Sequence, residues 1–182
     1  DLHSFPTRRS SDLSSCTLLG LSALHSDHPL NKGMLGMHGN LGPNVKTNEC
    51  DVLIAVGMRF DDRVTGKLET YAKQAKVIHL DIDPSEISKN VKADVAILGN
   101  CKRTLALLTE LIQSHKHTEW IESFQTYADK EYKEVIEKEV FPTDGPINMG
   151  EVVHAVSEAT HNEAILVTDV GQNQMFACRY FK

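Results

Sequence analysis

The chain has 182 residues, 41% of them hydrophobic and 24% charged, with a formal net charge of −6 at pH 7. This length fits one domain, or one domain with part of another, and the ordinary composition excludes wholesale disorder. The acidic balance disfavours a general nucleic-acid binder, and no apolar run approaches the roughly 18 residues of a transmembrane helix.

The first fifteen residues differ from the rest of the chain. Five of them are serine, and they show neither a helical nor a strand period. No apolar run follows Arg8 and Arg9, so a signal peptide is not expected. We interpret residues 1–15 as a non-native or disordered tail and leave them out of the predicted fold.

Four cysteines, Cys16, Cys50, Cys101 and Cys178, stand far apart, and none forms a C-x-x-C pair. This spacing suggests neither a zinc site nor a redox dithiol. Each lies in apolar or helical surroundings, where a free cysteine behaves as a small hydrophobic residue. We therefore expect reduced thiols in a cytoplasmic protein.

Up to residue 115, short apolar runs alternate with helical patterns. Runs at 51–57, 76–82 and 94–99 predict strands covered on both faces, and 17–20 fits the end of another. Helices are predicted over 43–50, from Pro84 with Asp83 as N-cap, and over 101–113. Strands that alternate with helices predict an α/β fold with a doubly wound parallel sheet.

The composition changes after residue 115. A helix with one apolar and one charged face is predicted over 118–140, and a turn-rich segment follows at 141–146. A helix over 148–160, a strand over 164–170 and a strand-to-helix turn then predict the start of a second α/β domain. We divide the chain into the tail 1–15, a first α/β domain 16–115, a helical linker 116–146, and the truncated second domain 147–182.

Ligands of parallel sheets bind at the carboxyl ends of the strands. There, Arg59, Asp61 and Arg63 follow the strand 51–57, and two arginines can grip a diphosphate through charge-assisted hydrogen bonds. A solvated loop with internal Arg–Asp pairs explains the same residues equally well.

Other strand ends carry weaker signals. Glycines around His38 permit close approach of a flat ligand, although tight turns explain them too. Asp81 and Asp83 could receive ribose hydroxyls, but Asp83 is equally well explained as a helix N-cap. Gly171 and Gln172 open a turn that could bind phosphate, although by itself a tight turn without a ligand explains them better. The G-x-G-x-x-G fingerprint is missing, and no catalytic triad or metal-ligand cluster is recognised.

Together these segments resemble a known family. The runs TLLGLSAL, GMLGMHG, RFDDRVTGK, VIHLDIDPSEISKNV and ILVTDVGQNQM, in this order, are similar to acetohydroxyacid synthase, the large catalytic subunit of acetolactate synthase. This is a thiamine-diphosphate enzyme family, and the resemblance extends from about Cys16 to Lys182. It implies most of a central FAD-binding domain, Rossmann-like in fold, and the opening of the domain that binds the thiamine diphosphate.

The resemblance also implies an activity. Family members condense two pyruvate molecules, or pyruvate and 2-oxobutanoate, with loss of CO2, in the biosynthesis of branched-chain amino acids such as isoleucine and valine. They bind FAD without net redox work, and Mg²⁺ anchors the thiamine diphosphate. They form dimers or tetramers with a small regulatory subunit. The catalytic glutamate and the metal motif of the family fall outside these residues, so we expect no catalytic or metal residue here and no activity from this fragment alone.

Cofactor contacts transfer residue by residue. Asn100 and Asn173 depart from the family, which has Asp and His at those places, and Met58 replaces a small residue. The implied FAD contacts are Thr17, Leu18, Leu19, Leu35, Gly36, Met37, His38, Gly57, Arg59, Asp61, Arg63, Val64, Asp81, Ile82 and Asn100; the implied thiamine diphosphate contacts are Gly171, Gln172 and Asn173.

Two alternatives stay open. Another FAD-containing thiamine-diphosphate carboligase, such as glyoxylate carboligase, would share the cofactors, although RFDDRVTGK argues against it. A non-catalytic nucleotide-binding module would share the predicted fold without the chemistry.

Overall fold

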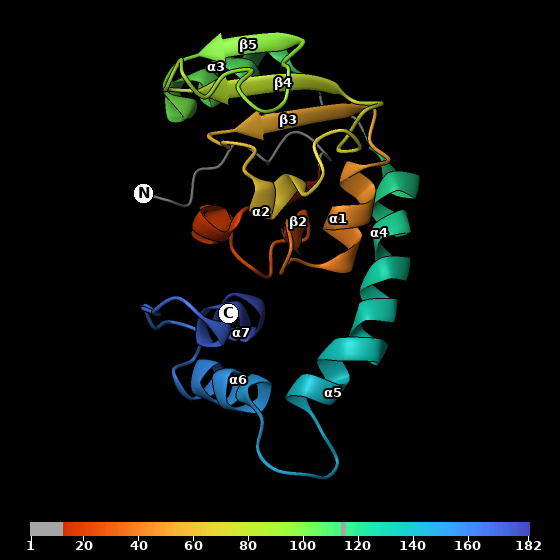
Figure 1. Ribbon diagram of the computed structural model, residues 1–182, viewed down its shortest axis with the longest axis vertical. Helices are drawn as coiled ribbons and strands as arrows, with labels where there is room; N and C mark the ends of the chain where they lie inside the picture. The colour runs from red at the N-terminus through yellow and green to blue at the C-terminus, as the bar shows by residue number, and fades with distance from the viewer. Residues whose placement is uncertain (1–12, 114–115) are drawn as a thin grey trace.

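The computed structural model describes residues 13–113 and 116–182, and its strands form two parallel sheets (Figure 1). The first pairs β1 (Ser14–Cys16) with β2 (Asn31–Met34). The second has the order β3 (Val52–Val56), β4 (Lys76–Asp81), β5 (Val95–Leu98). Parallel pairing, with a helix after four of the five described strands, confirms the predicted α/β fold.

The strands are in register at the edge where ligands of such sheets bind. Val56 of β3 pairs with Leu80 of β4, and Asp81 of β4 pairs with Leu98 of β5. The carboxyl ends of three strands therefore finish at the same level, and the loops that follow them start side by side.

Short helices follow the strands. A 3₁₀-helix η1 (Leu18–Ala23) follows β1, α1 (Leu41–Thr47) follows β2, and α2 (Asp62–Thr65) follows β3. The longer α3 (Cys101–Leu111) follows β5 and lies beside it in Figure 1. Each helix therefore begins close to the carboxyl edge of a strand.

A long helical segment runs down one side of the molecule from the sheets to the C-terminal helices (Figure 1). It consists of α4 (Thr118–Glu131), a π-helical turn η2 (Tyr132–Ile136) and α5 (Glu137–Val140). Gly42 of α1 permits close packing here, since a Cβ on it would lie 3.4 Å from the Phe124 ring. Beyond this segment, α6 (Met149–Ala159) packs on α7 (Gln172–Tyr180).

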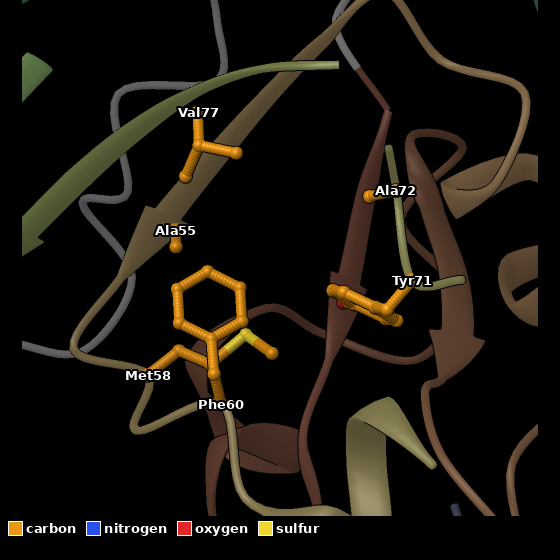
Figure 2. Packing of buried hydrophobic residues seen from close by; sticks show 6 residues of the cluster. All are labelled: Ala55, Met58, Phe60, Tyr71, Ala72 and Val77. Atoms are coloured by element: carbon orange, nitrogen blue, oxygen red, sulfur yellow. The ribbon is translucent and has the colours of Figure 1, made fainter. Parts of the chain in front are cut away.

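The hydrophobic core of the second sheet lies under the loop that follows β3. Phe60 is 2% exposed and packs edge-on against Tyr71, with 6.1 Å between ring centroids. Figure 2 shows its ring pointing towards Ala55, with Met58 beside it and Val77 beyond. The core is thus built against the residues that leave the sheet edge.

Three local predictions are wrong. Residues 18–20 form the start of η1, not a strand end, and Ser14 and Ser15 belong to β1 rather than to a tail. No helix starts at Pro84: Asp83 accepts hydrogen bonds from the backbone N–H and hydroxyl of Ser85, as an N-cap would, but Ser88 takes a φ of +61°, which a right-handed helix cannot include. The rest of the predicted tail, residues 1–12, lies outside the described residues.

The strand predicted over 164–170 is also wrong. Ile165 and Val167 are 93% and 87% exposed, and no strand among the described residues pairs with this segment. A β-strand requires a hydrogen-bonded neighbour, so an apolar run without one stays irregular. In the described part of the chain, no helix is both long and apolar enough to cross a membrane.

Candidate functional site

The loops after all five strands meet through backbone hydrogen bonds. The N–H of Leu35 donates to Cys16 O, and the N–H of Met37 donates to Arg63 O at 2.7 Å. Further along, the N–H of Gly57 donates to Leu80 O and the N–H of Gly99 donates to Asp81 O. We call this continuous row of residues 16–19, 35–39, 57–64, 81–82 and 99–101 the strand-end edge.

The two sheets join at Gly36. This residue is buried at φ +102°, and a Cβ on it would lie 2.6 Å from the backbone O of Arg63. The amide of Asn44 bonds both the N–H and the C=O of Gly36. Only glycine therefore permits the 35–39 loop to lie against the start of α2.

The arginines stand in the loop of residues 57–63, which we call the arginine loop. The Arg59 guanidinium is two-thirds exposed and lies 3.3 Å from the Asp61 carboxylate. Asp61 also caps α2 by accepting from the Arg63 N–H. The internal Arg–Asp pair is thus present, and the exposed guanidinium retains further N–H donors that an anion can reach.

Two side chains that the sequence analysis did not single out hold this loop. His79 is fully buried in β4 with its Nε2 2.9 Å from Met58 O, and Asn90 donates to the carbonyls of Arg59 and Phe60. Three successive carbonyls are fixed in this way, with Phe60 at φ +54°. The signal in the sequence for His79 is a histidine that stands between the apolar residues Ile78 and Leu80.

The end of β4 presents a carboxylate at the edge. Asp81 is 7% exposed, and its Oδ1 accepts from the N–H of Asp83 at 2.8 Å. Its Oδ2 lies 3.9 Å from His79 Nε2. Cys101 is close by, and burial together with the charge of Asp81 raises the pKa of its thiol. The carboxylate is held in place and keeps acceptor capacity for a hydroxyl.

Several implied contact residues are apolar and yet exposed. Leu19, Met37 and Ile82 are 95%, 62% and 68% exposed, and all three belong to the strand-end edge. Exposed apolar side chains along an edge that also carries arginines and carboxylates suit a ligand with both flat rings and charged groups.

Beside Gly36 the edge borders an open hollow of about 380 Å³. Met37, Arg63 and Val64 line it together with Tyr71. The Tyr71 hydroxyl is buried without a hydrogen-bond partner in the described structure, and burial raises its pKa. Space for a ligand therefore exists next to the implied FAD contacts.

Asn100 has a clear structural task. Its Oδ1 accepts from the N–H of Arg103 at 3.2 Å, so it is the N-cap of α3. An Asp at this position could cap the helix in the same way, because its carboxylate oxygen accepts the same bond.

The implied thiamine diphosphate contacts lie elsewhere. Gly171, Gln172 and Asn173 are exposed at the N-terminal end of α7, in the other half of the molecule from the β3–β5 sheet (Figure 1). No side chain caps this helix, so its first N–H groups remain available to an anion. Among the described residues, no group of three or more His, Cys, Asp or Glu could hold a metal ion.

Known proteins resemble this chain over most of its length. Residues 14–108 match the family model of the thiamine pyrophosphate enzyme, central domain. The chain is 45% identical to the acetolactate synthase large subunit of Parasynechococcus marenigrum and 42% identical to a probable acetolactate synthase large subunit of Methanocaldococcus jannaschii. It is 41% identical to the acetolactate synthase isozyme 2 large subunit of Escherichia coli.

Each of these alignments covers 91% of this chain but only 27% to 29% of the relative. The chain therefore spans less than a third of the length of the curated relatives it matches.

Proposed function

The chain belongs to the thiamine pyrophosphate enzymes, whose central domain it carries at residues 14–108, and on this premise we propose that it is part of an acetolactate synthase large subunit. The whole enzyme would join two pyruvate molecules, or pyruvate and 2-oxobutanoate, with release of one CO2. The observation that supports the proposal is the continuous strand-end edge, which carries two arginines, three carboxylates and exposed apolar side chains.

FAD fits the chemistry of this edge. Arg59 and Arg63 supply positive charge for its diphosphate, and Asp81 offers a carboxylate oxygen for a ribose hydroxyl. The exposed side chains of Met37 and Ile82 would cover its rings. When bound, FAD supplies the flavin ring system, which in the resembled family undergoes no net redox change.

Thiamine diphosphate would use the N-terminal end of α7. The uncapped N–H groups that follow Gly171 favour a phosphate, and Gln172 and Asn173 add side-chain amides beside them. Thiamine diphosphate, when bound with Mg²⁺, supplies the carbon nucleophile of the reaction. The activating glutamate and the metal ligands would come from parts of the enzyme other than these residues.

The remaining properties follow from the same proposal. Substrates are small 2-oxo acids, and the large subunit forms dimers or tetramers with a small regulatory subunit. A cytoplasmic location agrees with the four cysteines being free thiols. Glyoxylate carboligase remains the alternative enzyme, but each of the three relatives compared above carries acetolactate synthase in its name.

The test is a titration of the 182-residue chain with FAD, followed by flavin fluorescence with circular dichroism as the folding control. We expect saturable binding that weakens about tenfold or more in Arg59→Ala, because a charge-assisted hydrogen bond is lost. Lys138→Ala removes one positive charge on the remote α5 and should leave the affinity unchanged.

Three outcomes contradict the proposal. Saturable binding with equal affinity in Arg59→Ala would take the arginine loop out of the site. A well-folded chain that ignores FAD would contradict the assignment of the cofactor to this edge, and measured carboligation by these 182 residues alone would contradict the placement of the catalytic groups elsewhere.

A further inference from the structure

A buried carboxylate connects α4 to the loop that follows β2. Glu131, the last residue of α4, is 6% exposed. It accepts a hydrogen bond from the N–H of Leu41, the first residue of α1, at 3.0 Å, and another from the side-chain amide of Asn40 at 3.4 Å. Glu131 thereby satisfies a backbone donor at the start of α1 that the helix itself cannot satisfy.

The same carboxylate is paired with an arginine from the far end of the chain. One guanidinium nitrogen of Arg179, on α7, bonds Glu131, and the other donates to the carbonyl of Gly39 at 3.4 Å. The Arg179 side chain is 19% exposed, and its Nε is buried without a hydrogen-bond partner in the described structure. The planar fork of arginine thus binds two separate groups through two different nitrogens, a fixed geometry that the single ammonium nitrogen of lysine does not reproduce.

The groups that this pair holds close the 35–39 loop. Gly39 donates to Gly36 O, while the backbone N–H of Asn40 donates to Met34 O and its side chain accepts from the Met34 N–H. A Cβ on Gly39 would lie 2.3 Å from Met34 O, so this turn has no room for a side chain at residue 39. Fixing residues 39–41 therefore fixes the path of the whole loop.

Two segments with different proposed ligands meet at this pair. The 35–39 loop belongs to the strand-end edge proposed to bind FAD, and α7 carries residues 171–173 at its other end. Removing either partner leaves the other charge buried and uncompensated, which is far costlier than losing an exposed pair.

We propose that Glu131 and Arg179 are positioning residues that couple the FAD-binding 35–39 loop to α7. The inference rests on the proposed function for its ligand but not for its geometry. The loop is held in its binding conformation only while α7 is docked through Arg179, so a change at α7 is felt at the flavin contacts.

The test uses the 182-residue chain and the variants Arg179→Met, Arg179→Lys, Glu131→Gln and the double variant. We expect Arg179→Met to weaken FAD binding about tenfold, and Arg179→Lys to restore part of the affinity. The double variant should lose less affinity than the sum of the two single losses, because both substitutions break the same interaction, and fully additive losses would contradict the pairing. Lys130→Met, at an exposed neighbouring position, is the matched control and should bind as the parent does.

Hydrogen exchange supplies a readout that needs no ligand. In Arg179→Met and Glu131→Gln, the amides of Gly39, Asn40 and Leu41 should exchange faster, while those of α3 keep the parent rate. Folded variants with parent exchange rates in the loop would overturn the coupling, as would unchanged FAD affinity in Arg179→Met. If the parent itself ignores FAD, the proposed function fails and the exchange rates still decide the coupling.

Discussion

At the residue scale, the Asn90 side chain bonds the backbone of the arginine loop. Its side-chain amide donates to the carbonyls of Arg59 and Phe60 at 3.2 and 3.0 Å, and His79 holds the preceding carbonyl. The positive φ of Phe60 is a conformation that bulky residues rarely adopt. The surrounding bonds therefore maintain a strained arginine loop.

Replacing Asn90 with Asp should destabilise the fold. The change puts a carboxylate against two carbonyl oxygens and removes both donors, so we expect a loss of about 1–3 kcal/mol in the free energy of unfolding. Urea denaturation measures it, with Gln113→Glu as an exposed amide-to-carboxylate control. Equal stability of the two variants would mean that the Asn90 bonds contribute nothing.

Tyr180 gives a prediction for alkaline pH. Burial and the hydrogen bond to Glu139 raise its pKa to about 12 from an ordinary value near 10. A pKa raised by folding stabilises the protein below the unfolded value, and this stabilisation is lost as the pH rises through the folded one.

The stability difference between the parent and Tyr180→Phe should therefore shrink by roughly 1 kcal/mol between about pH 9 and about pH 11. Urea unfolding of both proteins across this range measures the difference directly. A difference that stays constant with pH would show that the Tyr180 hydroxyl is not held in a buried bond.

At the scale of elements, substitutions of Asn100 can test its role as a helix N-cap separately from a contact with FAD. As N-cap of α3 it should tolerate Asp, whereas Asn100→Ala should cost about 1 kcal/mol of unfolding free energy. Thermal unfolding of both variants measures this. Tighter FAD binding in Asn100→Asp would add a ribose contact to the cap, and full stability of Asn100→Ala would contradict the capping role.

Elements with strong local signals could be predicted from the sequence. The strands β3, β4 and β5 and the helices α3 and α6 lie where continuous apolar runs and leucine stripes place them. The run 164–170 has the same apolar character but fails, because strand formation depends on a neighbour that periodicity does not report. The helix expected from Pro84 does not form although Asp83 makes the bond of an N-cap, because Ser88 takes a positive φ that a right-handed helix cannot include.

At the scale of the whole molecule, the order of parallel strands was enough to bring the implied FAD contacts to one edge. What the sequence could not provide are the long-range contacts that hold them, such as Asn90 on the arginine loop and Glu131 beneath the 35–39 loop. Thirty residues separate Asn90 from Phe60, and ninety separate Glu131 from Leu41. No local period or motif relates residues so far apart.

Cysteine alkylation with and without FAD tests most directly whether a nucleotide lies along the strand-end edge. Cys101 is half-buried at this edge, and its Sγ lies 3.8 Å from where a Cβ on Gly57 would stand. Burial raises the pKa of its thiol, so the reaction is run at alkaline pH. We expect FAD to slow the alkylation of Cys101 in proportion to its occupancy, and to need a higher concentration for the same effect in Arg59→Ala. Saturable FAD binding with an unchanged rate at Cys101 would contradict a nucleotide site at this edge.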